Sequence, residues 1–247
     1  MNQPELFGLI FVIVFFGLML ALVIVGRSRP VGQFREISAF TRLKRAIGLA
    51  VEAGSRLHLS IGRGWLTGPQ SAVAFVGLTA ADRIARSATV SDRPPVVTSG
   101  EGTITVLSQE SLWGAAQAVG AEFDPLRGRL TGVTPFSYVA GALPVIYDEE
   151  VSANLLIGNF AAEVALLNEA GERTGSLTIS GTDNISGQAV LYATAEEPLI
   201  GEETYASGAY LGAGALHIAS VRAQDILRWV IILLIMAGAV LKLAGVL

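Results

Sequence analysis

RLHLSIGRGWLTGPQSAVAFVGLTA, from Arg56 to Ala80, is the stretch that decides the fold. Its first part, Arg56 to Ile61, is a short run typical of a strand, and the glycine-rich segment Gly62 to Pro69 then breaks the chain. The apolar stretch that begins at Ser71 is long enough for a helix. The pattern therefore predicts a strand, a glycine-rich turn and a helix, in that order.

The same unit recurs along the chain. Further strands are predicted at Pro94 to Thr98, Ala153 to Ile157 and Ser176 to Ser180, with helical segments between them. Between the second and third strands, residues 122–135 are turn-rich and residues 136–147 are expected to be helical despite Pro144. We read the strands as near-continuous apolar runs, which are typical of a parallel sheet covered by helices on both faces. We therefore predict an α/β domain with a Rossmann-like, doubly wound parallel sheet.

Two apolar runs flank this domain. Leu6 to Val25 contains no charge and no proline, and Trp229 to Leu247 is interrupted only by Lys242, whose long stem can reach an interface. We expect transmembrane helices at 1–26 and 226–247. The leading MNQPE has no basic side chain, so the first run is interpreted as a retained anchor rather than a signal peptide.

Residues 27–54 are expected to form a short turn at Ser28 to Gly32 and then a basic, amphipathic juxtamembrane helix. Its apolar stripe could lie on anionic lipid headgroups or pack onto the domain. The stripe consists of Ile37, Phe40, Leu43, Ile47 and Val51, and the basic residues after the first span are Arg27, Arg29, Arg35, Arg42, Lys44 and Arg45. Because positive residues stay inside, we expect the α/β domain, residues 55–225, to be cytoplasmic. Both termini would then lie outside an inner (plasma) membrane.

Composition excludes several functions. The net charge of −4 does not indicate a nucleic-acid partner, and the absence of cysteine excludes disulfides, zinc-thiolate sites and thiol catalysis. His58 and His217 are each isolated on apolar segments, which is typical of structural histidines. The sequence indicates no metal site and identifies no cofactor.

A ligand could bind where the predicted strands end, because helix N-termini there present backbone donors. The alternative is that glycine, serine and asparagine occur there because tight turns and helix caps require them. The candidate ligand-binding residues are Ser60, Gly62, Arg63, Gly64, Ser99, Gly100, Gly158, Asn159, Gly181, Thr182 and Asp183. As a cofactor motif, GRGWLTG is weak, because its glycine spacing departs from the dinucleotide fingerprint and it contains no Gly-Lys-Ser/Thr. Four carboxylates could act as acids or bases but form no pair by spacing: Glu101, Glu149, Glu163 and Asp183.

Two further patterns concern assembly and origin. Residues 205–221 are rich in small side chains and could form one helix that leads into the second span and contacts another subunit. Two stretches have similar sequences: RGWLTGP at Arg63 to Pro69 and RGRLTGVTP at Arg127 to Pro135. Either a duplicated half-domain or convergent turn chemistry would produce this similarity.

The segment Phe34 to Gly64, together with the flanking spans, resembles an uncharacterised family of bacterial and archaeal membrane proteins that carry a domain of unknown function. The resemblance implies a membrane-anchored α/β domain and supplies no activity. Two functions stay open: a binding or scaffold module that self-assembles through its cytoplasmic domain as a homo-oligomer, and an enzyme or sensor that binds a nucleotide or phosphometabolite. We favour the first, without catalysis, because no catalytic constellation is visible.

Overall fold

The computed structural model describes residues 3–28, 34–68 and 71–245. The chain divides into two compact units, one of Arg35–Leu211 and one of Met1–Phe34 with Gly212–Leu247. Most of the turn expected at Ser28 to Gly32, and Pro69 in the first glycine-rich turn, lie outside the described residues.

The larger unit is built on a six-stranded parallel sheet, which confirms the predicted fold class. The strand order is β3-β2-β1-β4-β5-β6, so the chain starts in the middle, moves to one side and returns to build the other. Neighbouring strands are parallel throughout. The strands are β1 Arg56–Gly62, β2 Val96–Ser99, β3 Gly128–Leu130, β4 Val151–Asn159, β5 Leu177–Thr182 and β6 Glu197–Leu199.

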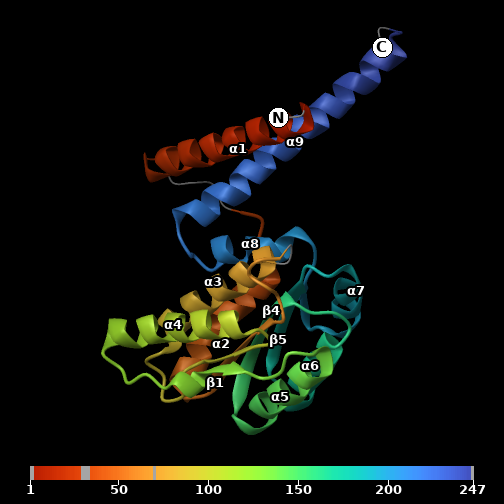
Figure 1. Ribbon diagram of the computed structural model, residues 1–247. Coiled ribbons are helices and arrows are strands. Elements are labelled where there is room, and N and C mark those ends of the chain that lie inside the picture. Colours follow the sequence, from red (N-terminus) through yellow and green to blue (C-terminus); the bar gives the residue numbers. More distant parts are fainter. Residues whose placement is uncertain (1–2, 29–33, 69–70, 246–247) are drawn as a thin grey trace. The chain divides into compact units, whose positions relative to one another are not determined.

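Helices cover both faces of the sheet (Figure 1). On one face, α2 (Ser38–Ala53), α3 (Ser71–Ala88) and α4 (Gly102–Val119) enclose an apolar core. The strands contribute to that core through such residues as Leu59, Leu155 and Ile179. On the other face, α5 (Pro135–Asp148), α6 (Val164–Thr174) and α7 (Ile185–Thr194) form a smaller apolar cluster around Leu156.

The central strands are not continuous apolar runs, which corrects the expectation from the sequence. In β1, Leu57, Leu59 and Ile61 alternate with His58 and Ser60, and all five are buried. The same alternation occurs in β5, where Thr178, Ser180 and Thr182 are also buried. On its second face the sheet is therefore polar at β1 and β5 and nevertheless covered, so these side chains must be hydrogen-bonded to one another or to the backbone.

The apolar stripe of the basic helix packs onto the domain. Phe40 and Leu43 of α2 are each 1 % exposed and belong to the larger core. Phe40 also stacks on Tyr210, with ring centroids 4.9 Å apart. The hydroxyl of Tyr210 donates to the carbonyl of Arg35 at 2.6 Å, so the chain enters and leaves this unit at one place.

Both edge strands were missed by the sequence patterns. β3 lies in the segment expected to be turn-rich, and β6 is equally short. β3 also shows that the two similar RG-x-LTG stretches occupy different positions, since Arg63 follows a strand whereas Gly128 to Leu130 form one. The similarity therefore reflects no equivalent structural unit.

The small-residue stretch 205–221 is not one helix, contrary to expectation. Helix α8 (Glu202–Tyr210) ends before Leu211, and α9 (Ala215–Leu243) begins after a break. Gly212 and Gly214 have φ angles of +72° and +136°, which a helix does not tolerate and which glycine adopts without strain.

The smaller unit consists of α1 (Gln3–Ser28) and α9. Two segments, Gln3–Gly26 and Ala215–Leu243, are long and apolar enough to cross a membrane. Large apolar side chains of both helices, among them Phe7, Ile24, Leu234 and Ile235, are more than 60 % exposed, as lipid-facing side chains would be.

Candidate functional site at the carboxyl edge of the sheet

The predicted ligand-binding residues lie at one edge of the sheet, because β2, β1, β4 and β5 are neighbours and end there. We call this the carboxyl edge. The backbone N–H of Gly100 donates to the carbonyl of Gly62 at 2.7 Å, and that of Arg63 donates to the carbonyl of Asn159 at 3.1 Å. In register, Gly62 pairs with Asn159 and Gly158 with Thr182. Gly62, Gly158, Asn159, Gly181 and Thr182 belong to the strands themselves rather than to the loops beyond them.

Close backbone packing accounts for the glycines in the strands. A Cβ atom on Gly158 would lie 1.7 Å from the carbonyl oxygen of Ile61, and one on Gly62 would lie 2.5 Å from that of Asn159. On Gly181, a Cβ atom would lie 2.8 Å from Oγ1 of Thr204. Since no side chain fits at these distances, glycine is required here for strand and helix packing, independently of any ligand.

The polar side chains of the candidate set have partners within the chain. Oγ of Ser99 lies 2.6 Å from Oγ1 of Thr105. Thr182 donates to the carbonyl of Phe160 at 2.9 Å and accepts from its N–H at 3.0 Å. Nδ2 of Asn159 donates to Oδ1 of Asp183 at 2.8 Å. These groups therefore hold the loops together and are not directed at an open cleft.

The helix N-termini at this edge are also occupied by the chain's own side chains. The carboxylate of Glu101 accepts from the N–H of Ile104 at 2.8 Å at the start of α4. Burial alone would raise the pKa of Glu101, but the hydrogen bonds from the backbone of Thr103 and Ile104 outweigh it and lower the pKa below its ordinary value. Asn184 caps α7 and Thr134 caps α5 in the same way.

Within the part of the chain that the structure describes, Arg63 and Glu163 form the one ion pair that joins candidate loops at this edge. Nη2 of Arg63 lies 3.3 Å from Oε1 of Glu163, and the two side chains are 22 % and 3 % exposed. A Cβ atom on Gly100 would lie 2.4 Å from Cγ of Arg63, so Gly100 makes room for the arginine stem. Nε of Arg63 is buried and has no hydrogen-bond partner. Gly64, another candidate residue, lies next to Arg63 in the loop after β1.

The remaining acid and base candidates are dispersed. Glu149 lies at the opposite edge, where it pairs with Arg56 and Arg129. Glu101, Glu163 and Asp183 are bound as described above, and none of the four carboxylates pairs with another. Among the described residues, no group of three or more histidine or acidic side chains could hold a metal ion.

Beneath the edge, a buried polar network crosses the sheet. Nδ1 of His58 lies 3.0 Å from Oδ1 of Asn154, and its Nε2 lies 2.9 Å from Oγ1 of Thr98. Asn154 in turn donates through Nδ2 to Oγ of Ser176 at 2.6 Å. Because Oδ1 can only accept, the neutral imidazole carries its proton on Nδ1 and accepts from Thr98.

The network continues from Thr98 to the candidate edge. The hydroxyl of Tyr138 lies 3.1 Å from Oγ1 of Thr98 and also bonds to Ser60. Burial raises the pKa of the Tyr138 phenol and, against a smaller opposing effect of its hydrogen bonds, keeps it neutral. Ser60 is thus the end of an internal chain of hydrogen bonds, with its hydroxyl held by Tyr138.

The sequence patterns missed a set of large apolar side chains around the carboxyl edge. They come from the loops or first helical turns after β1, β3 and β5. Their exposed fractions are 65 % for Trp65, 67 % for Val133, 72 % for Phe136 and 86 % for Ile185. We call these four residues the apolar rim. One sequence signal could have identified the apolar rim: an aromatic or β-branched residue inside an otherwise polar, glycine-rich loop, as in GRGWLTG.

The chain belongs to a family defined by a domain of unknown function, DUF6754, whose model matches residues 1–247. A domain of unknown function is the part of the resemblance drawn from Phe34 to Gly64 with which this match agrees. Comparisons with curated proteins and with solved structures found no match.

His58 provides a test of the buried network. Burial lowers the pKa of His58 from 6.5 to about 4, with a smaller opposing effect from the hydrogen bond to Asn154. The neutral form therefore stabilises the fold fully above pH 6.5, and this contribution, about 3 kcal/mol at most, is lost as the pH falls towards 4. In the full-length His217→Gln variant, His58 is the remaining histidine. Its NMR titration should show a midpoint near 4, and a midpoint above 6 would contradict the network.

Proposed function

We propose that this protein is a membrane-anchored, non-catalytic binding module that self-assembles through the carboxyl edge of its α/β domain. The observation that carries the proposal is the apolar rim. Trp65, Val133, Phe136 and Ile185 are all at least 65 % exposed, and they come from three loops at one edge of the sheet. Large apolar side chains exposed on several loops at one edge of a folded domain indicate an interaction surface.

The polar groups inside the rim support a protein partner over a small molecule. A small-molecule site offers donors and acceptors that await a ligand. Here Ser60, Ser99, Asn159 and Thr182 are bonded within the chain, and three helix N-termini carry side-chain caps. An apolar surface with satisfied polar groups can be buried against a protein without a desolvation penalty for unpaired groups.

A second copy of the chain is the occupant that we infer. Anchoring by α1 and α9 would confine copies to one membrane, which raises their effective concentration and lets even a modest apolar contact associate them. The glycines of the anchors are compatible with close helix approach as well: a Cβ atom on Gly8, Gly17 or Gly238 would meet nothing within 4 Å in the isolated chain.

The α/β domain of this proposed assembly faces the cytoplasm. The supporting feature is the cluster of basic residues that follows the first apolar segment, including Arg35, Arg42, Lys44 and Arg45. The termini then lie on the opposite side of a plasma membrane.

Removal of Phe136 should weaken self-association. Phe136→Ser removes a 72 % exposed ring from the rim, whereas Leu126→Ser removes an equally exposed side chain, 73 %, from the segment before β3, away from the rim. Neither change should alter the stability of the monomer by more than about 0.5 kcal/mol. Analytical ultracentrifugation in detergent should show a dissociation constant raised about tenfold or more by Phe136→Ser and unchanged by Leu126→Ser. A wild-type chain that is monomeric at micromolar concentration, or equal effects of both variants, would contradict assembly through the rim.

The orientation can be measured with cysteines, because the chain has none of its own. Ala118→Cys lies at an exposed position of α4, and Ala244→Cys follows α9. In intact cells, a membrane-impermeant maleimide should label Ala244→Cys at once and Ala118→Cys only after lysis. The opposite pattern would refute a cytoplasmic domain.

A second candidate function is binding of a nucleotide or phosphometabolite at the carboxyl edge. The observation that favours it is Arg63, which lies beside the switch in strand order between β1 and β4 and has a buried Nε without a partner. In a panel of nucleotides and sugar phosphates, a ligand of this site should raise the melting temperature of the wild type and not that of Arg63→Gln. The absence of any shift in the wild type would count against this candidate and leave the assembly proposal intact.

A further inference from the structure

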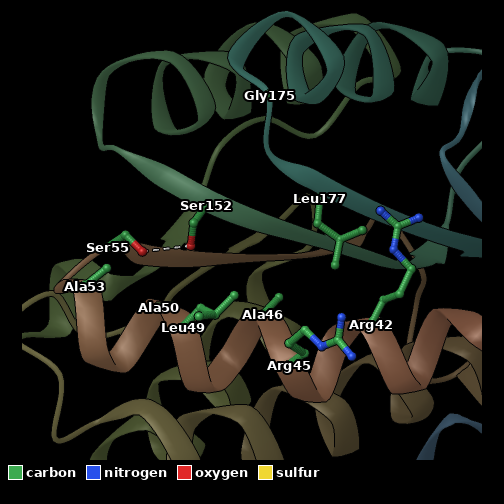
Figure 2. Close-up of a pocket in the computed structure, with 10 residues that line it drawn as sticks. All are labelled: Arg42, Arg45, Ala46, Leu49, Ala50, Ala53, Ser55, Ser152, Gly175 and Leu177. Atoms are coloured by element: carbon green, nitrogen blue, oxygen red, sulfur yellow. Dashed lines mark hydrogen bonds between the residues drawn. The ribbon is translucent and has the colours of Figure 1, made fainter.

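A pocket of about 420 Å³ lies at the opposite edge of the sheet from the apolar rim, between α2 and the starts of three strands. Helix α2 contributes one wall, and Ser55, Ser152 and Leu177 contribute the other, just before β1 and at the beginnings of β4 and β5. Figure 2 shows Arg45 on α2 and Leu177 on the wall that faces it, with Ser55 and Ser152 towards the other end of the pocket. We call it the α2 pocket.

The α2 pocket combines a cation with an apolar wall and hydroxyl groups. Ala46, Leu49 and Leu177 form the apolar part, and Leu49 is 57 % exposed. Oγ of Ser55 donates to Oγ of Ser152 at 2.9 Å, as the dashed line in Figure 2 marks. A volume of this size fits a small amphiphilic molecule.

The two arginines of the pocket differ in their partners. Arg42 is held by Glu197, with Nη1 2.7 Å from Oε1, and by Glu196. These hydrogen bonds raise the pKa of Arg42, so its guanidinium stays charged and is paired with the two carboxylates. Arg45, in contrast, has no carboxylate within ion-pair distance anywhere in residues 3–28, 34–68 and 71–245. Its guanidinium is therefore the charge that remains to meet a ligand.

The geometry points to the α2 pocket as a binding site for a phosphate ester that carries an apolar arm. The phosphate meets the guanidinium of Arg45, which can donate two parallel hydrogen bonds to it. The apolar arm lies against Leu49 and Leu177 and loses its contact with water. The carbonyl end of α6, next to Gly175, repels the anion and so directs the head towards Arg45.

Such a phosphate ester can be a lipid of the bilayer or a soluble metabolite, and the site uses the same chemistry for both. The α2 pocket and the apolar rim are independent of each other, because they lie at opposite edges of the sheet and share no residue. Loss of self-assembly would leave this inference untouched, and loss of ligand binding would leave the assembly untouched.

Dihexanoyl phosphatidic acid, used below its micelle concentration, tests the site on the full-length protein by calorimetry. Arg45→Gln should weaken its binding about tenfold or more, because a charge-assisted hydrogen bond is lost. Lys44→Gln is the matched control, since it removes the same charge one position away, from a side chain that does not line the pocket. Leu49→Ser should weaken the binding as well. Arg45 and Leu49 are both exposed on α2, so substitution of either residue leaves the fold intact.

Three further probes separate the outcomes. Dihexanoyl phosphatidylcholine, which has no net charge, and inorganic phosphate should each bind more weakly than the phosphatidic acid. Equal losses with Arg45→Gln and Lys44→Gln, or inorganic phosphate binding as tightly as the amphiphile, would overturn the inference. Native mass spectrometry after release from nanodiscs that contain phosphatidylglycerol identifies the source. A lipid adduct that Arg45→Gln abolishes assigns a bilayer lipid, whereas binding of the short-chain ester without such an adduct assigns a soluble phosphate ester.

Discussion

The pairing of β1 with β4 in the middle of the sheet is the contact on which the rest of the structure depends. It joins the two halves of the strand order, and at its end the backbone of Gly158 approaches the carbonyl of Ile61 so closely that a Cβ atom would lie 1.7 Å from that oxygen. The strands on either side, the loops of the carboxyl edge and the helices on both faces take their positions from this pair. A side chain at Gly158 would separate the strands and displace the loops that carry the apolar rim.

Because both faces of these central strands are covered, the chain must satisfy any polar group that it places there. It does so with a continuous set of hydrogen bonds that includes His58, Asn154 and Thr98. The imidazole stays neutral because burial lowers its pKa to about 4. Such a network fixes the packing of α5 and α6 more specifically than apolar contacts alone, since each partner has one place where its hydrogen bonds are complete.

The sequence patterns were sufficient for the α/β class and the four central strands, because glycine-containing turns and the helical segments between the strands mark them. They failed for β3 and β6, which are short edge strands fixed by their neighbours rather than by their own residues. They failed again at Gly212 and Gly214, where small apolar residues suggested a helix but positive φ angles end it. The candidate residues lie at one edge because the four strands that carry them are neighbours in the sheet. That Asn159 and Thr182 are bonded within the chain depends on partners 24 and 22 residues away, which no local pattern contains.

The carboxyl edge thus combines internally bonded polar groups with an exposed apolar rim, and the central claim is that this edge meets another copy of the chain. A cryo-EM reconstruction of the full-length protein in nanodiscs tests it most directly. The proposed function predicts two or more copies in contact through Trp65, Phe136 and Ile185, with no density other than protein over Arg63. A single copy with non-protein density beside Arg63 would contradict it and would favour ligand binding at the carboxyl edge.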